Sequence, residues 1–148
     1  MPAFKDSGGF ALSDIFPAEL LGTEKIMTTV LFVGGHTALR KQLRALFNHG
    51  NGFDAFVEAG NAVEAMAKAK RRSPNLAVLD FSLPDTGVSQ LVQKLKASKP
   101  ELPIFLLTTD YSVYTEKKAL SCGITAVFSK LDDLATLLAN ARAVCGIE

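Results

Sequence analysis

The chain has 148 residues, 48% apolar and 21% charged, which is typical of one compact globular domain. Its net charge of +1 gives no reason to expect a nucleic-acid or membrane partner. The apolar runs are far too short to cross a bilayer, and the first residues lack the pattern of a secretory leader. Two cysteines without metal-ligand spacing predict reduced thiols and a cytoplasmic protein.

Residues 1–26 do not share the pattern of the rest of the chain, because they mix Gly, Ser and Pro with scattered apolar side chains. Within them, Ser13–Leu21 fits one short helix. Met27 stands directly before the first strand-like run and would serve as a start in its own right. Three interpretations stay open: a disordered arm, a docking helix, or coding sequence extended too far upstream. We expect an N-terminal arm over 1–26 and one domain over 27–148.

Five short apolar runs alternate with helical patterns after this arm, and each run predicts a strand. The runs are TTVLFV (28–33), FDAFVEA (53–59), NLAVLD (75–80), PIFLLTT (103–109) and ITAVFS (124–129). Five strand-helix units in about 120 residues predict an α/β fold, with a parallel sheet covered by helices on both faces. In such a sheet, functional residues gather at the carboxyl ends of the strands.

The helical patterns predict which side chains face the sheet. They cover 37–47, 61–72, 88–98, 112–123 and 132–144. In the first, Leu39 and Leu43 begin an apolar face that continues to Phe47. The second begins with Asn61 and Glu64 at capping-box spacing, and its apolar face is predicted from one set of side chains, Val63, Met66 and Ala67. In the third, the inward set is Val88, Leu91, Val92 and Leu95.

Polar residues and glycines mark the carboxyl ends of four predicted strands. The first strand ends at Gly34-Gly35, the third at Asp80, the fourth at Thr108 and the fifth before Lys130. A carboxylate can act as a nucleophile toward phosphorus, and a lysine and a hydroxyl can neutralise and bond a transferred phosphoryl group. These strand-end residues are therefore the candidate functional residues of the chain.

This set, together with LDFSLPDTG, resembles the receiver domain of response regulators in two-component systems. The resemblance implies a flavodoxin-like, doubly wound five-stranded sheet of order 2-1-3-4-5. It implies that Asp80 accepts phosphate from a histidine kinase, that Thr108 is the switch hydroxyl and that Lys130 pairs with the phosphoaspartate. In this family, Mg²⁺ sits at the phosphorylated aspartate, and the resemblance gives it Asp80 and the backbone carbonyl of Ser82.

The sequence departs from the family at the metal position. Receivers end the first strand with two acidic residues that hold Mg²⁺, and here Gly34 and Gly35 offer no side-chain oxygen. His36 follows, but imidazole suits softer metals. Two charges about 4 Å apart interact by roughly 4 kcal/mol at an effective dielectric near 20, so Lys130 alone cannot offset both a carboxylate and an incoming phosphoryl group. We expect Mg²⁺ to bind weakly or not at all.

Other departures favour a degenerate receiver, or pseudo-receiver. Val127 replaces the aromatic switch residue, and the adjacent Phe128 faces the other side of its strand. Leu131 replaces the proline that usually follows the lysine, and Val88 falls where a loop glycine is usual. We therefore expect a single-domain, non-enzymatic receiver in phosphorelay signalling that acts through protein contacts.

The expected partner is a sensor histidine kinase or another signalling protein. The family also uses the surface of the fourth helix, fifth strand and fifth helix for dimers, which here maps onto Ser112–Cys122, Ile124–Ser129 and Asp132–Val144. One alternative is a working phosphoacceptor at Asp80. A second is an α/β module that binds a small ligand beside Gly34-Gly35, and a third is an interaction domain without a ligand. The basic run KAKRR (68–72) is interpreted as a solvated helix end.

Overall fold

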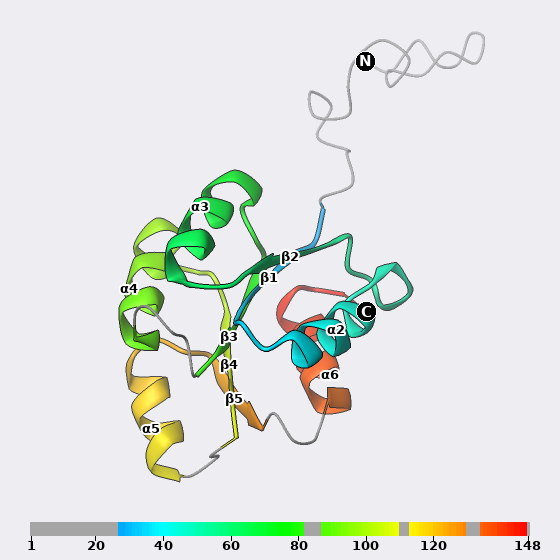
Figure 1. Cartoon of the computed structure of the whole chain (residues 1–148). Coiled ribbons are helices and arrows are strands. Elements are labelled where there is room, and N and C mark those ends of the chain that lie inside the picture. Colours follow the sequence, from blue (N-terminus) through cyan, green and yellow to red (C-terminus); the bar gives the residue numbers. More distant parts are fainter. Residues whose placement is uncertain (1–26, 82–86, 110–112, 130–133, 148) are drawn as a thin grey trace, which may run out of the picture.

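The computed structural model of the chain describes residues 27–81, 87–109, 113–129 and 134–147 (Figure 1). The arm over 1–26, the helix expected at Ser13–Leu21, and the site residues Ser82 and Lys130 lie outside these described residues. Within the described ranges, no helix combines the length and apolar character that a membrane span requires.

The strands form one parallel five-stranded sheet of order β2-β1-β3-β4-β5, which confirms the predicted order. The strands are β1 (Thr29–Val33), β2 (Ala55–Ala59), β3 (Leu76–Asp80), β4 (Ile104–Thr108) and β5 (Ala126–Ser129). Every residue of β1, β3 and β4 is buried, whereas the two edge strands β2 and β5 are only partly so. The continuous apolar runs of the sequence therefore belong to the strands that helices cover on both faces.

Five α-helices cover the two faces of the sheet, with α2 and α6 on one side and α3, α4 and α5 on the other (Figure 1). The helices are α2 (Thr37–Leu46), α3 (Ala62–Arg72), α4 (Val88–Ser98), α5 (Val113–Ser121) and α6 (Leu134–Val144). A short 3₁₀ turn, His49–Asn51, follows α2. All five predicted helices are present.

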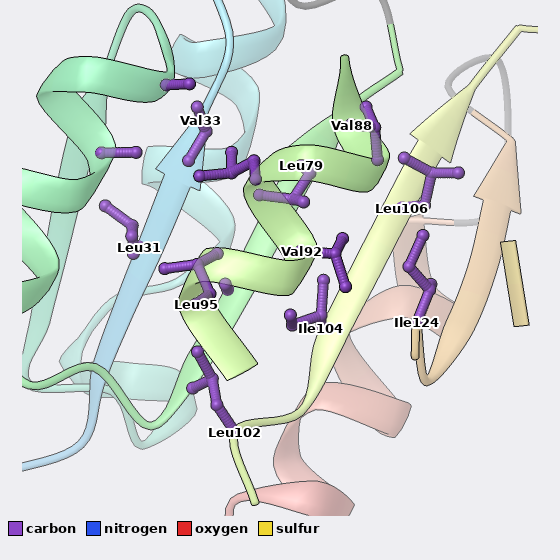
Figure 2. Close-up of a cluster of buried hydrophobic side chains, with 14 of the residues drawn as sticks. Leu31, Val33, Leu79, Val88, Val92, Leu95, Leu102, Ile104, Leu106 and Ile124 are labelled. Carbon is purple, nitrogen blue, oxygen red and sulfur yellow. The ribbon is translucent and has the colours of Figure 1, made fainter. Parts of the chain in front are cut away.

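Side-chain alternation along the strands builds two separate cores. In β1, Leu31 packs with the cluster under α3, α4 and α5, whereas the adjacent Phe32 packs with the cluster under α2 and α6. Figure 2 shows the first cluster, where Leu95 of α4 lies between Leu31 and Ile104. A fully buried leucine of this kind contributes about 1.5–3 kcal/mol to the free energy of unfolding. The predicted inward set of α4 is confirmed, because all four of its members are buried.

The predicted apolar face of α3 is wrong at Val63, which is 76% exposed, and at Ala67, which is also exposed. The helix buries Ala62 and Ala65 instead, and Met66 is only partly buried against the core. Small side chains let α3 approach the sheet closely, and a pattern that ranks residues by apolar size does not find that face. The predicted cap is confirmed: Asn61 Oδ1 accepts from the backbone N–H of Glu64 at 2.8 Å. The Glu64 carboxylate in turn accepts from the N–H of Gly60 at 2.5 Å.

Candidate functional site

The sheet register places the predicted site residues at neighbouring strand ends. Val33 pairs with Leu79, so Gly34 follows β1 beside Asp80, the last residue of β3. Asp80 pairs with Leu107, so Thr108 lies one position further along the adjacent strand β4. Thr108 pairs with Ser129, the residue before Lys130. Topology thus brings Gly34, Asp80 and Thr108 to one end of three adjacent strands.

Asp80 and Thr108 are both buried, with only 3% and 2% of their surface exposed. A buried carboxylate is costly unless other groups hydrogen-bond it or offset its charge. The burial distinguishes Asp80 from an ordinary solvent-exposed aspartate at a strand end. It also means that a group reaching the carboxylate must enter through the loops at the carboxyl end of the sheet.

Gly34 and Gly35 differ in the space around them, although the sequence treats them as one pair. A Cβ atom at Gly34 would lie 2.9 Å from Cβ of Asp80 and 2.9 Å from Cζ of the buried Phe32. A Cβ atom at Gly35 would meet nothing within 4 Å. The N–H of Gly34 also donates to the carbonyl of Ala59 at 2.9 Å, which holds this position against the end of β2. The side chains of Asp80 and Phe32 therefore occupy the position of a Cβ atom at Gly34, whereas the corresponding position at Gly35 is open.

His36 begins α2 and has a structural role there. It is the N-cap residue, and its Nδ1 accepts from the N–H of Leu39 at 3.1 Å. Serine, threonine, asparagine and aspartate usually fill this position, and imidazole satisfies the same exposed N–H. His36 is therefore a helix-entry residue, and the cap fixes where the chain turns after Gly35.

The described residues at this end of the sheet do not fit a tightly held Mg²⁺ ion. Magnesium prefers several oxygen ligands in octahedral geometry, and Asp80 supplies the one carboxylate at the ends of β1 and β3. Gly34 and Gly35 supply no side-chain oxygen. Across the described part of the chain, no three His, Cys, Asp or Glu side chains gather in a way that could hold a metal ion.

A cavity of about 470 Å³ lies between α4 and α5, beside the residue that follows Asp80. Its walls are mainly apolar, with Phe81, Val88 and Leu106 among them, and Lys118 and Cys122 add polar groups. The size suits a small molecule. Gly34 and Gly35 do not line this cavity. It is therefore distinct from the space beside Gly34-Gly35 that the ligand-binding alternative needs.

Sequence reasoning did not single out Phe81, whose side chain is 51% exposed despite its apolar character. Its backbone N–H donates to the carbonyl of Leu107 at 2.9 Å, which extends the pairing of β3 with β4 past Asp80. One available signal was a large aromatic residue directly after the acidic end of a buried strand. That pattern places an apolar ring outside the sheet but does not show what it lines.

Val127 and Phe128 face opposite sides of β5, as predicted. Val127 belongs to the core under α3, α4 and α5, and Phe128 belongs to the core under α2 and α6. There the Phe128 ring packs against Phe105, with ring centroids 5.0 Å apart. Phe128 is therefore a core residue and does not replace the missing aromatic residue on the other face.

Comparison with known proteins identifies the relatives of this arrangement. The family model of the response regulator receiver domain matches residues 30–142. A transcriptional regulator of Pseudomonas aeruginosa is 34% identical over 118 residues, covering 80% of this chain and 56% of the regulator. The DNA-binding transcriptional activator DevR/DosR of Mycobacterium tuberculosis is 34% identical over 100 residues, covering 68% of this chain and 44% of the activator. The chain thus spans about half the length of these curated relatives.

Solved structures show the same fold. A CheY-like response regulator receiver domain protein from Methanospirillum hungatei superposes with a TM-score of 0.73 at 23% sequence identity. The match covers 82% of this chain and 95% of that protein. At this level of identity the likeness concerns the arrangement of strands and helices, and it confirms the doubly wound architecture that the sequence predicts.

Proposed function

Because the chain belongs to the response regulator receiver family, we propose that it is a two-component signalling module of degenerate type. In this proposal Asp80 lacks a tightly bound Mg²⁺, phosphoryl transfer to it is impaired, and the domain acts through contacts with other proteins rather than as an enzyme. The observation that carries the proposal is the contact at Gly34. The end of β1 packs so closely on Asp80 that a Cβ atom at Gly34 would lie 2.9 Å from the Asp80 Cβ.

This contact changes what the glycine pair means. Loss of two carboxylates alone would leave room for another ligand in their place. At Gly34, however, the side chains of Phe32 and Asp80 already occupy the space, so that a Cβ atom there would lie 2.9 Å from each of them. A metal would therefore need a different arrangement of β1 in addition to new oxygen atoms, and cores adjust to such changes only at a cost in free energy.

The partners follow from the family. Receiver domains work with histidine kinases in two-component systems, and we propose a sensor histidine kinase or another signalling protein as the partner here. We further propose that copies of the chain associate through α5, β5 and α6. Two features support this surface: β5 is an edge strand, and Leu120 of α5 is 46% exposed.

The phosphoacceptor alternative keeps one specific observation in its favour, which is the burial of Asp80 and Thr108 at adjacent strand ends. A phosphodonor experiment separates the two functions. The protein is incubated with acetyl phosphate and Mg²⁺, and intact mass is measured before and after acid treatment. We expect no acid-labile gain in mass, whereas a receiver that retains both acidic residues gains a phosphoryl group under the same conditions.

The variant Asp80→Asn is the negative control for this experiment, because it lacks the carboxylate that would accept the phosphoryl group. An acid-labile gain that the native protein shows and Asp80→Asn lacks would overturn the degenerate reading and establish a working phosphoacceptor. The proposed self-association is measured separately by sedimentation of Leu120→Asp beside a matched variant, Val63→Asp, in α3 near the opposite edge of the sheet. Only Leu120→Asp should weaken association, and equal behaviour of the two variants would exclude the α5–β5–α6 surface.

A further inference from the structure

Positive charge gathers at the β2 edge of the sheet, which is the edge opposite β5. Residues 36–72 carry seven basic and three acidic side chains, whereas the rest of the chain carries nine basic and twelve acidic ones. Six of these cations flank β2, and we call them the basic edge: Arg40, Lys41 and Arg44 of α2, with Lys68, Arg71 and Arg72 of α3. The near-neutral net charge of the chain therefore hides a strongly uneven distribution.

One acidic residue, Glu58 of β2, organises the centre of the basic edge. Arg40 Nη1 lies 3.3 Å from Glu58 Oε1, and Arg44 pairs with the other carboxylate oxygen. Lys68 reaches around the edge and donates to the backbone carbonyl of Glu58 at 2.5 Å. These bonds hold two arginines at the Glu58 carboxylate and a lysine at the Glu58 backbone carbonyl. Lys41, Arg71 and Arg72 are exposed beside them and extend the positive surface outward.

The basic edge is hollowed, and its floor is partly apolar. A cavity of about 500 Å³ has Phe56 and Val57 of β2 in its lining, with Arg44, Lys68 and Arg71 among the cations around it. The Arg44 guanidinium lies over the Phe56 ring, 5.7 Å from its centroid. A second cavity of about 220 Å³, with Lys41 in its lining, shares Arg44 and Glu58 with the first. Protein–protein interfaces commonly combine apolar contacts with charged and polar groups, and arginine is enriched in them.

We propose that the basic edge is a docking surface for an acidic, partly apolar segment of a partner protein. Carboxylates of the segment pair with Lys41, Arg71 and Arg72, and an apolar side chain packs into the cavity beside Phe56. This inference goes beyond the proposed function and does not depend on it, since it concerns the β2 edge and not the surroundings of Asp80.

Two observations favour an acidic protein segment over other occupants. Nucleic-acid-binding domains typically have an isoelectric point above about 9, whereas this chain has a pI near 7.8 and holds a carboxylate at the centre of the surface. Addition of a partner strand to β2 is disfavoured, because Lys68 already bonds the carbonyl of Glu58. The segment therefore docks through its side chains and does not extend the sheet.

The test compares two triple variants of the whole chain that change net charge equally. Lys41→Glu, Arg71→Glu and Arg72→Glu reverse the exposed part of the basic edge, while Lys94→Glu, Lys117→Glu and Lys118→Glu reverse three exposed lysines on α4 and α5. The probe is a fluorescently labelled twelve-residue peptide of Glu, Asp and Leu, whose binding is followed by anisotropy. A labelled DNA duplex is the second probe, and amide NMR shifts locate the peptide on the native protein.

We expect the peptide to shift amide signals of α2, β2 and α3, and the basic-edge variant to bind it at least tenfold more weakly than the native protein. The α4–α5 variant should stay within twofold of native, and binding should weaken with added salt. The proposal would be overturned by equal loss of peptide binding in both variants, or by amide shifts confined to other elements. It would also be overturned if the peptide did not bind at low salt, or if the duplex bound more tightly than the peptide. Circular dichroism spectra establish that both variants remain folded.

Discussion

At the amino end of the sheet, side chains complete the hydrogen bonding of the strands. At the carboxyl end, in contrast, β1 is followed by Gly34 and Gly35, which have no side chains. Asn75 Oδ1 accepts from the N–H of Thr29 at 2.8 Å, and Thr125 Oγ1 accepts from the N–H of Ile104 at 3.1 Å. Asp54 Oδ2 accepts in the same way from the N–H of Thr28. The carboxyl end instead sets buried Asp80 beside bare backbone at Gly34. Polar residues at the amino end are thus explained by backbone bonding, whereas at the carboxyl end a buried carboxylate lies beside a residue without a side chain.

Of the variants that test this contrast between the two ends, Gly34→Asp is expected to lose the most stability. The new Cβ would lie 2.9 Å from both Asp80 Cβ and the Phe32 ring, and the new carboxylate would stand next to that of Asp80. Overpacking and like-charge repulsion together should lower the free energy of unfolding by about 3 kcal/mol, or the melting temperature by roughly 10 °C. Urea and thermal unfolding measure this change.

Gly34→Ala separates the two causes, because it keeps the steric conflict and adds no charge. It should retain a substantial part of the loss. Full stability of both variants would show that β1 relaxes freely away from Asp80, and would remove the structural basis for a degenerate metal position.

The amino end should respond next most strongly, through Asn75→Ala. This change leaves the N–H of the buried Thr29 without its acceptor, which should cost about 1–3 kcal/mol. Asn140→Ala on the exposed surface of α6 is the matched control, since its side chain bonds a carbonyl one turn earlier in the same helix. That control should change stability by less than about 0.5 kcal/mol. Similar losses in the two variants would contradict the structural role of Asn75.

Much of this arrangement follows from the sequence, and the parts that do not follow share a physical reason. Continuous apolar runs predict buried parallel strands, and strand ends can be read from the residue that terminates each run, as at Asp80. The burial of Ala62 in place of Val63 depends on how closely a helix approaches the sheet. The filled space at Gly34 likewise depends on the position of Phe32, which no local pattern records. Sequence shows which carboxylates are missing, but only packing shows which of them the fold could accept.

Cys145 gives the amino end a pH dependence. Burial raises the pKa of its thiol from 9.0 to about 11, while the nearby charge of Lys99 lowers it to a smaller extent. The folded chain therefore keeps its proton in a window, from about pH 9 to about pH 11, in which the unfolded chain loses it. Stability due to this thiol is complete below about pH 9 and falls as pH rises through the window.

The variant Cys145→Ser removes this ionisation, so comparison with the native protein isolates its contribution to stability. Urea midpoints at about pH 8 and about pH 10 should differ less in Cys145→Ser than in the native protein. Cys122→Ser, which leaves Cys145 in place, should match the native difference. A native difference that Cys145→Ser fully reproduces would show that other groups carry the alkaline loss.

The smallest effect on stability is expected from Gly35→Asp, which makes it the sharpest partner to Gly34→Asp. A Cβ at Gly35 meets open space, so the free energy of unfolding should change by less than about 0.5 kcal/mol. The variant restores one carboxylate at the end of β1, where a Cβ atom meets no neighbour within 4 Å, and two carboxylates offer more oxygen ligands than one to a magnesium ion. Titration with Mg²⁺, followed by amide NMR shifts at Gly35 and Asp80, should therefore show tighter binding in Gly35→Asp than in the native chain. Unchanged weak binding would mean that the position of β1 against Asp80, rather than the number of carboxylates, excludes the metal.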